Sequence, residues 1–174
     1  MNVSRPASLA AASNFIVKLR PYKSSDLESV ANLFTASIHG LAINHYDATQ
    51  RAAWATQPPD MNEWDKRLSG LHTVVAESND NELAGFLSYA MNGYIGLLYV
   101  SSRYPRRGVA SLLYREIESA LLFAGVEALF TEASVMARPF FQRQGFLIVE
   151  EQIVRRRGVA FRRYAMRKSI RAGG

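Results

Sequence analysis

Cysteine is absent from the 174-residue sequence. A chain without thiols can have neither a disulfide framework nor thiolate metal ligands, and it has no cysteine nucleophile. Histidine offers no substitute, because His39 and His45 lack the i, i+4 spacing of a helical metal pair. We therefore expect no metal site, and the lack of cysteine favours a soluble, cytoplasmic protein.

Long apolar runs are also missing. No stretch approaches the roughly 18 residues that a membrane-spanning helix needs, so we expect no membrane association. The alanine-rich residues 7–12 are too weakly hydrophobic for the core of a secretory signal. No acidic residue precedes Asp26, which leaves an organellar transit peptide open. We favour a flexible tail over residues 1–14.

Two phosphate-binding signatures do not occur in the sequence. There is neither a glycine-rich loop that ends in Gly-Lys-Ser/Thr nor a GxGxxG motif. Internal repeats and linkers are absent as well, and a chain of this length is typical of one domain. We expect that domain to span residues 15–170, with enough hydrophobic residues, 48%, to form a core without metals or disulfides.

Charge is unevenly distributed along the chain. Residues 1–102 contain 7 Lys and Arg against 9 Asp and Glu, whereas residues 103–174 contain 14 against 6. The net charge of +6 therefore belongs to the C-terminal part. Such a local excess indicates an anionic partner, either a nucleotide phosphate or a nucleic acid, or merely aids solubility.

One strand and one helix are predicted near the N-terminus. Apolar and polar residues alternate from Phe15 to Pro21, which predicts a strand. Ser25 and Glu28 have the spacing of a capping box, and apolar residues at helical spacing follow them. We therefore expect a helix over about Asp26–His39.

Further helical signals follow that helix. Asp47 and Gln50 repeat the capping-box spacing, and Pro58-Pro59 then interrupts the chain before a short helix over Met61–Leu68. These segments predict a helical flap rather than a second domain.

The middle of the chain changes to short strands. Residues 71–77, 83–91 and 94–100 are rich in β-forming residues, and Asn92-Gly93 between the last two is a strong hairpin signal. An antiparallel meander follows from this pattern.

The C-terminal part alternates helices and strands. An amphipathic helix between Pro105 and Gly125 leads into a strand over 126–134, so strands 94–100 and 126–134 should be parallel neighbours. A short helix over Arg138–Gln144 and a hairpin of 146–156 and 159–166 complete the chain.

The junction between strand 94–100 and the following helix favours anion binding. Ser101 to Gly108 form an arginine-rich loop that ends where the helix begins, and a helix N-terminus offers unpaired N–H groups and a positive dipole end. Gly108 lets the backbone approach a ligand closely, and Arg103, Arg106 and Arg107 add charge. Taken alone, this loop is as compatible with a sharp turn and solvated arginines as with a phosphate site.

The residues around this loop resemble a known family. An apolar strand, the run Arg106-Arg107-Gly108-Val109-Ala110 at a helix start, and the later run Ala137 to Phe146 are similar to the GNAT superfamily of acyl-CoA-dependent N-acetyltransferases. The similarity spans about residues 16–168. It implies an α/β (α+β) fold with a mixed, mostly antiparallel, seven-stranded twisted sheet flanked by helices, and a helical flap over the acceptor.

The resemblance also implies a site for acetyl-CoA as co-substrate. Strand residues Leu98, Tyr99 and Val100 would pair with the pantetheine arm. The pyrophosphate would be bound by Arg106, Arg107, Gly108, Val109, Ala110 and Ser111. Ser134, where many members have asparagine, and Phe141 would lie near the bound cofactor.

Two positions depart from the family pattern. Pro105 stands where the phosphate loop usually begins with Gln or Arg, so one side-chain contact is lost. Phe141 stands where members often have a tyrosine that protonates the departing thiolate, so the usual acid is missing.

Candidates for proton transfer and acceptor binding follow from the residues nearby. Glu132 is a carboxylate in an otherwise apolar strand, which makes it our candidate base, and Tyr164 is a second candidate acid. His39, His45 and Tyr46 belong to the flap and are candidate acceptor contacts, although capping, surface or core roles are the simpler interpretation for such residues.

The activity that these features imply is acetyl transfer from acetyl-CoA to a primary amine, by direct attack in a ternary complex. The acceptor is a small-molecule or peptide amine that the sequence does not identify. Two alternatives stay open, namely a non-catalytic acyl-CoA sensor and a nucleic-acid-binding module that uses Arg155-Arg156-Arg157 and Arg162-Arg163. Nucleic acid is the weaker of these, because no nucleic-acid motif accompanies the arginines. The exposed C-terminal hairpin could also pair in a homodimer.

Overall fold

The computed structural model describes residues 15–171, and the predicted tail over 1–14 lies outside them. Seven strands form a single sheet in the order β1-β2-β3-β4-β5-β7-β6. Their bounds are β1 (Val17–Pro21), β2 (His72–Ser78), β3 (Leu83–Tyr89), β4 (Tyr94–Val100), β5 (Ala128–Ser134), β6 (Leu147–Arg156) and β7 (Val159–Ser169). Within this sheet β4 and β5 are parallel, while all other neighbours are antiparallel. The predicted fold class is confirmed.

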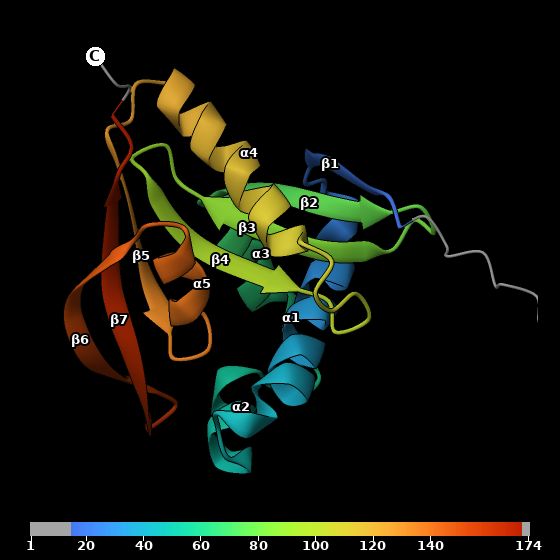
Figure 1. Cartoon of the computed structure of the whole chain (residues 1–174). Coiled ribbons are helices and arrows are strands. Elements are labelled where there is room, and N and C mark those ends of the chain that lie inside the picture. The colour runs from blue at the N-terminus through green and yellow to red at the C-terminus, as the bar shows by residue number, and fades with distance from the viewer. Residues whose placement is uncertain (1–14, 172–174) are drawn as a thin grey trace, which may run out of the picture.

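Helices cover both faces of the sheet. They are α1 (Leu27–Leu41), α2 (Ala48–Trp54), α3 (Met61–Ser69), α4 (Val109–Phe123) and α5 (Arg138–Arg143), with short 3-10 turns η1 (Ser24–Asp26) and η2 (Ala42–Asn44). Figure 1 shows α4 across one face of β2 to β4 and α1 and α3 on the opposite face. The α2 helix lies beyond the C-terminal end of α1.

The start of α1 differs from the sequence prediction. Ser25 and Glu28 are exposed and form no capping box. The Asp26 carboxylate instead accepts a hydrogen bond from the Lys23 backbone N–H at 2.8 Å and two from the Arg20 guanidinium, both at 2.8 Å. Because Arg20 at the end of β1 holds this carboxylate, the chain turns at Ser24 and the α-helix begins only at Leu27.

The second start signal is confirmed. Asp47 accepts from the Gln50 backbone N–H at 2.8 Å, and the Gln50 side chain accepts from the Asp47 N–H at 3.1 Å. This reciprocal cap begins α2, which together with α3 forms the expected helical flap.

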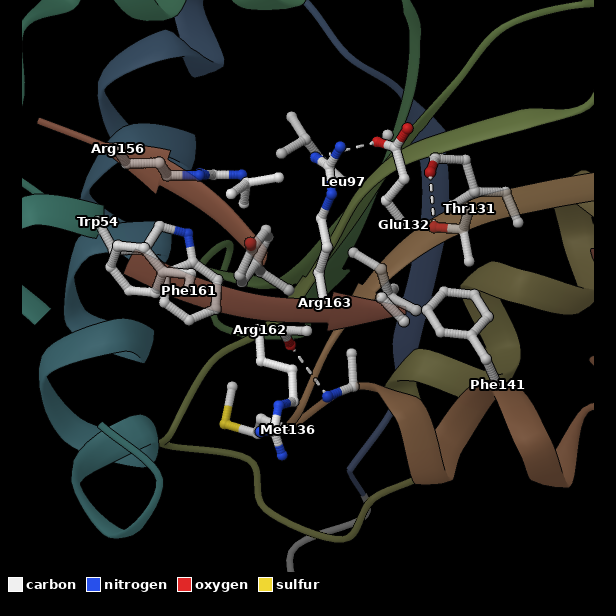
Figure 2. A pocket seen from close by; sticks show the side chains of 18 of the residues that line it. Trp54, Leu97, Thr131, Glu132, Met136, Phe141, Arg156, Phe161, Arg162 and Arg163 are labelled. Carbon is white, nitrogen blue, oxygen red and sulfur yellow. Dashed lines mark hydrogen bonds and ion pairs between the residues drawn. The ribbon is translucent and has the colours of Figure 1, made fainter. Parts of the chain in front are cut away.

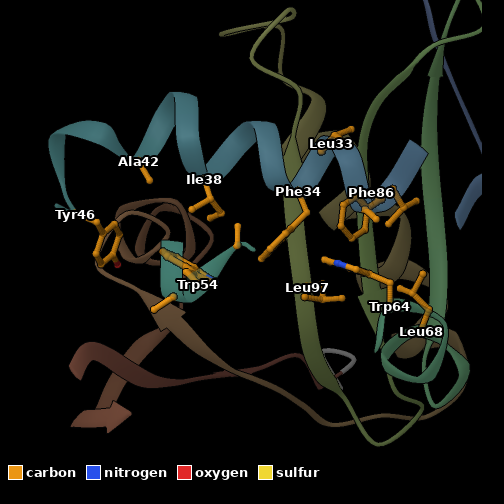
Figure 3. Packing of buried hydrophobic residues seen from close by; sticks show 14 of the residues in the cluster. Leu33, Phe34, Ile38, Ala42, Tyr46, Trp54, Trp64, Leu68, Phe86 and Leu97 are labelled. Atoms are coloured by element: carbon orange, nitrogen blue, oxygen red, sulfur yellow. The ribbon is translucent and has the colours of Figure 1, made fainter. Parts of the chain in front are cut away.

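Two hydrophobic clusters lie on the two faces of the sheet. The α1-side cluster joins α1 to the flap and the sheet, and Figure 3 shows Phe34, Trp64 and Phe86 packed together at one end and Tyr46 and Trp54 at the other. The α4-side cluster includes Ile95, Leu113, Ile117, Leu129 and Phe146. The central strands are therefore buried on both faces, in keeping with the nearly continuous apolar run of β3.

A bulge in β4 separates it from β5. Ser88 pairs with Leu97 and Tyr89 with Ile95, which leaves Gly96 as an extra residue in β4. As a result Ile95 faces the α4-side cluster and Leu97, two residues later, faces the α1-side cluster. Pairing with β5 is limited to Tyr94 with Phe130 and Ile95 with Thr131. The two strands therefore diverge from the bulge onward, as Figure 1 shows.

The β6–β7 hairpin is fixed to the flap at its turn. The Arg157 guanidinium donates to the Ala53 carbonyl at 2.7 Å and forms an ion pair with Glu63 at 3.2 Å. The Gln50 side chain donates to the Ala160 carbonyl at 3.3 Å. These bonds close the gap between the hairpin and α2 on the side of the sheet where β4 and β5 diverge.

Among residues 15–171, no helix has both the length and the apolar character that crossing a membrane would require.

Candidate functional site

A cavity of about 100 Å³ opens where β4 and β5 diverge. Its walls come from elements that are distant in sequence, namely the flap, β4, β5, the residues after β5, and the β6–β7 hairpin. Figure 2 shows Trp54 and Phe161 on one side of the cavity, Glu132 and Thr131 on the other, and Met136 and Phe141 below. Apolar and aromatic side chains line the space together with charged and hydroxyl-bearing ones, so both a hydrophobic and a polar part of a small molecule could bind there.

Glu132 is the carboxylate of this cavity. The Tyr94 hydroxyl donates to its Oε2 atom at 3.0 Å. Arg163 Nη1 lies 3.6 Å from the same atom, as the dashed line in Figure 2 shows. Burial, with the nearby negative charge of Glu132, raises the pKa of Tyr94, so Tyr94 keeps its proton and stays a donor at neutral pH. The carboxylate is 39% exposed, which leaves its other oxygen accessible to a ligand.

A second polar group lies near the C-terminal end of β5. Burial raises the pKa of the Tyr46 hydroxyl, which also interacts with the Ser134 side chain and the Val135 backbone. The Ser134 hydroxyl accepts from the Ala137 N–H at 3.1 Å. Tyr46, Ser134 and Phe141 all line the cavity. A protonated phenol thus lines the same cavity as Phe141, which stands where the family often has a tyrosine.

The loop between β4 and α4, where the sequence predicts an anion site, is exposed and separate from this cavity. Arg106 and Gly108 have positive φ angles of 55° and 73°, and Gly108 is the N-cap of α4. A Cβ atom added at Gly108 would meet no atom within 4 Å, so the space in front of the helix end is open. The first N–H groups of a 15-residue helix therefore face solvent beside the arginines of the loop.

Only two of the three predicted loop arginines remain for a ligand. Arg103 binds Glu82 at 2.6 Å, which takes its charge away from the helix end. Arg106 has no hydrogen bond or ion pair within the described chain, and Arg107 lies 5.3 Å from the centroid of the Phe15 ring. The charge at this site is smaller than the sequence suggested.

The structure brings six of the residues predicted for the site into the cavity: Tyr46, Leu98, Tyr99, Glu132, Ser134 and Phe141. Val100 packs on the α4-side cluster, and the residues from Arg106 to Ser111 form the loop and the first turn of α4.

The three remaining predicted residues, candidates for proton transfer or acceptor contact, do not line the cavity either. His39 Nε2 bonds the Ala55 carbonyl at 2.7 Å, which fixes the flap to α1. His45 is exposed after η2. Tyr164 is buried in the α4-side cluster, with the Arg138 guanidinium 4.7 Å from its ring centroid. Packing and flap attachment account for these side chains.

Sequence reasoning missed several polar groups that line the cavity or its rim. Arg67 on α3 and Arg156 on β6 line it, and Tyr94 reaches Glu132 from the start of β4. In the sequence, Arg156 stood out only as part of the basic run Arg155-Arg156-Arg157. No sequence pattern brings Arg67 and Arg156 together, because they lie on different elements that meet only through the fold.

Comparison with known proteins places the chain in context. The family model described as an acetyltransferase (GNAT) domain matches residues 42–168. An uncharacterized N-acetyltransferase, YafP, of Escherichia coli strain K12 is 34% identical over 151 residues, which is 87% of this chain and 95% of that protein.

Solved structures share the fold. A GCN5-related N-acetyltransferase from Rhodopseudomonas palustris has a TM-score of 0.83 and 31% identity, over 88% of this chain and 95% of its own. A PaiA N-acetyltransferase from Thermoplasma acidophilum in complex with coenzyme A has a TM-score of 0.69 and 17% identity, over 89% of this chain and 99% of its own.

Proposed function

The chain belongs to the GNAT acetyltransferase family, and from that premise we propose that it transfers an acetyl group from acetyl-CoA to a primary amine within a ternary complex. One observation carries this proposal. The cavity between the diverging strands β4 and β5 holds a carboxylate and a protonated phenol, while an open helix N-terminus follows directly on β4. A thioester and an amine could meet in such a space.

The residues present fit the co-substrate. Beyond Ile95, β4 has no partner on the β5 side within the described sheet, so its backbone is free to pair with an extended arm at Leu98 to Val100. The N-terminus of α4, with Arg106, Arg107 and Gly108, would bind the pyrophosphate. Acetyl-CoA supplies an acetyl group activated as a thioester. That the PaiA N-acetyltransferase was solved with coenzyme A supports this choice.

Glu132 is the proposed base. An ammonium group must lose a proton before its nitrogen can form the new C–N bond, and Glu132 accepts that proton directly or through one water. Tyr94 and Arg163 hold the carboxylate at one oxygen, which fixes its orientation in the cavity. Backbone N–H groups of β4 near the bulge would stabilise the developing oxyanion.

Tyr46 is the proposed acid. When the C–S bond breaks, the sulfur needs a proton, and Phe141 has none to give. Tyr46 lines the same cavity as Phe141 and keeps its proton at neutral pH because burial raises its pKa. These two facts support Tyr46 over Tyr164, which packs in the α4-side cluster.

We also propose that residues 15–170 form one catalytic domain. The nucleic-acid alternative loses support from the hairpin, because Arg157 pairs with Glu63, Arg162 with Glu151 at 2.9 Å, and Arg163 with Glu132. With three of its five arginines paired, the patch attracts phosphates more weakly than its sequence suggests.

A turnover assay tests the proposal. Acetyl-CoA is incubated with the protein and a panel of primary amines, and free thiol is measured with time. We expect thiol release that depends on the amine and a matching acetylated product by mass spectrometry. Equilibrium dialysis that detects no acetyl-CoA binding at millimolar concentration would exclude both the enzyme and the sensor.

A further inference from the structure

The cavity carries more positive than negative charge. Arg67, Arg156, Arg162 and Arg163 line it, against Glu132 alone among carboxylates of the described chain. Two of these arginines are already engaged. Arg162 pairs with Glu151 at 2.9 Å, and Arg163 donates to Gln152 Oε1 at 2.8 Å and approaches Glu132. Arg67 and Arg156 have no carboxylate at ion-pair distance among residues 15–171.

Aromatic rings hold these two unpaired arginines in place. The Arg67 guanidinium carbon lies 5.3 Å from the Phe34 ring centroid and 4.9 Å from that of Trp64. Arg156 lies 5.9 Å from the Trp54 ring centroid, and Figure 2 shows its side chain extended beside Trp54 toward the middle of the cavity. Both side chains are thus oriented before any ligand arrives, which reduces the entropy that binding would cost.

Their arrangement is unfavourable without a counter-ion. Arg67 is half-buried, and burial lowers its pKa because its charge has lost water without gaining a carboxylate. Arg156 is close enough to lower that pKa further by charge repulsion. Two like charges held near each other in a partly buried site leave a strong requirement for a negative group between them.

Two uncharged donors adjoin the arginines. Trp54 is only 9% exposed, and its indole Nε1–H is buried without an acceptor in the described chain. The Tyr99 hydroxyl lies beside it, within the electrostatic reach of both Arg67 and Arg156. Two guanidinium groups, an indole N–H and a phenol therefore lie close together, and all of them can donate to oxygen.

We propose that the acceptor amine carries an oxyanion, a carboxylate or a phosphonate, which binds Arg67, Arg156 and the Trp54 N–H while the amine points toward Glu132. This inference rests on the proposed function and specifies its substrate class as amino-acid-like molecules. The pyrophosphate of acetyl-CoA is not a competing explanation, because its proposed site is the loop at Arg106 to Gly108, beyond the C-terminal end of β4. Charge-assisted bonds to both guanidinium groups would fix the position of the amine.

Matched amines test the inference. Three probes share one spacer of three methylene groups between the amine and the second polar group: 4-aminobutyrate, 3-aminopropylphosphonate and the neutral 3-amino-1-propanol. The L-amino acids and their carboxamides extend the panel. We expect kcat/KM for the better anionic members to exceed that of their neutral counterparts at least about 10-fold. The anionic probe with the higher kcat/KM shows whether the site recognises a carboxylate or a phosphonate.

Variants link that preference to the two arginines. Arg67→Gln and Arg156→Gln should each raise KM for the anionic amine about 10- to 100-fold, with little change for the neutral amine and none for acetyl-CoA. Arg67→Lys should restore part of the loss. Arg115→Gln removes one exposed charge from α4, away from the cavity, and serves as the matched control.

Binding can be read without turnover. The chain has two tryptophans, Trp54 and Trp64, so titration with 3-aminopropylphosphonate and 4-aminobutyrate should change an intrinsic fluorescence signal that Trp54→Phe removes. Neutral amines that bind and react as well as the anionic ones would overturn the inference and leave the acetyltransferase proposal intact. So would the absence of any fluorescence response to both anionic probes. Failure of the activity alone, with anion binding retained, would count against the proposed function instead.

Discussion

In the proposed mechanism, two side chains on different sides of the cavity share the proton transfers. Glu132 is held through one oxygen by Tyr94 and Arg163, and Tyr46 is held near Ser134 at the end of β5. Burial raises the pKa of Tyr46, so this phenol keeps its proton at neutral pH. The separation of Glu132 and Tyr46 on two walls of one cavity allows one residue to accept a proton and the other to donate one.

Replacing Glu132 by glutamine tests the base. Glu132→Gln retains the shape but not the proton acceptor, so kcat should fall about 10²- to 10⁴-fold at neutral pH, with acetyl-CoA affinity nearly unchanged. The defect should shrink as the pH rises, because more of the acceptor amine is then already neutral. Initial rates of acetyl transfer, measured across the pH range, follow this change.

The control for this variant is Glu116→Gln, on the exposed face of α4. A Glu132→Gln protein with wild-type rates at every pH would remove Glu132 from the mechanism.

Paired tyrosine variants test the acid. Tyr46→Phe removes the hydroxyl in the cavity and should lower kcat by about 10²-fold, whereas Tyr164→Phe should leave kcat within about a factor of three. Single-turnover thiol release measures the step directly. The reverse order of effects would restore Tyr164 as the acid, and equal small effects would leave solvent as the proton source.

For individual side chains, sequence reasoning found some site residues and missed others. Glu132 was found because a carboxylate in an apolar strand is conspicuous, and Ser134 because it stands where many members of the family have asparagine. The flap histidines were chosen by residue type, yet His39 bonds a backbone carbonyl and His45 is exposed. Arg67 and Arg156 were not identified as a pair, because their neighbourhood depends on how α3 and the β6–β7 hairpin fold over β4. Pairwise proximity of this kind is not encoded in local spacing.

Among the elements, α4 has glycines with left-handed backbone at both ends. Gly108 precedes the helix with φ of 73° and Gly125 follows it with φ of 84°, and neither has an atom within 4 Å of where a Cβ would be. Both therefore carry the same conformational cost for any other residue, about 1–2 kcal/mol. Only Gly108 lies where the phosphates are expected.

Because Gly108 and Gly125 have similar backbone conformations, their valine variants form a matched pair. Gly108→Val and Gly125→Val should lower the melting temperature by similar amounts, several degrees each. Only Gly108→Val should abolish acetyl-CoA binding, because its side chain would occupy the space in front of the helix N-terminus. Isothermal calorimetry with acetyl-CoA, together with thermal melts, separates the two effects. Equal loss of binding in both variants would mean that the helix end is not the phosphate site.

The sequence predicted which helices and strands form better than it predicted how they contact one another. The Asn92-Gly93 hairpin, the Asp47 cap and the parallel pair β4–β5 follow from turn chemistry and periodicity, and all are present. The bulge at Gly96 and the short length of the parallel pairing were not anticipated. Both depend on how the strands twist around the two clusters, and a single strand sequence does not reveal this.

For the molecule as a whole, one ion-pair network joins the first strand, the second strand and α1. Arg20 Nε lies 2.6 Å from Glu77 Oε2, and its two terminal nitrogens bind Asp26. The Asp26 side chain is only 10% exposed. Hydrogen bonds from Arg20, and then from the Lys23 backbone, hold the pKa of Asp26 below its usual value of 3.8. Folding is therefore linked to the ionisation of this carboxylate.

This linkage predicts that the difference in unfolding free energy between the wild type and an Asp26 variant depends on pH. Because the pKa is lower in the folded state, the stabilisation is complete above about pH 4 and is lost as the pH falls through the folded value. Asp26→Asn should cost about 2–3 kcal/mol of unfolding free energy at pH 7, and the difference from wild type should shrink in acid. Urea unfolding at several pH values measures it. Asp65→Asn, an exposed carboxylate of α3, is the control. A difference that stays constant down to pH 2 would contradict the assignment.

The short pairing between β4 and β5 determines how this protein opens in its native state. The sheet consists of two β units, β1 to β4 and β5 to β7, and only two residue pairs connect their backbones. Leu113 of α4, packed in one cluster with Ile95 and Leu129, connects them through side chains. Amide hydrogens of both units should therefore exchange with solvent in one cooperative event for as long as α4 stays packed on the sheet. Truncation of Leu113 would let the β5 to β7 unit exchange on its own.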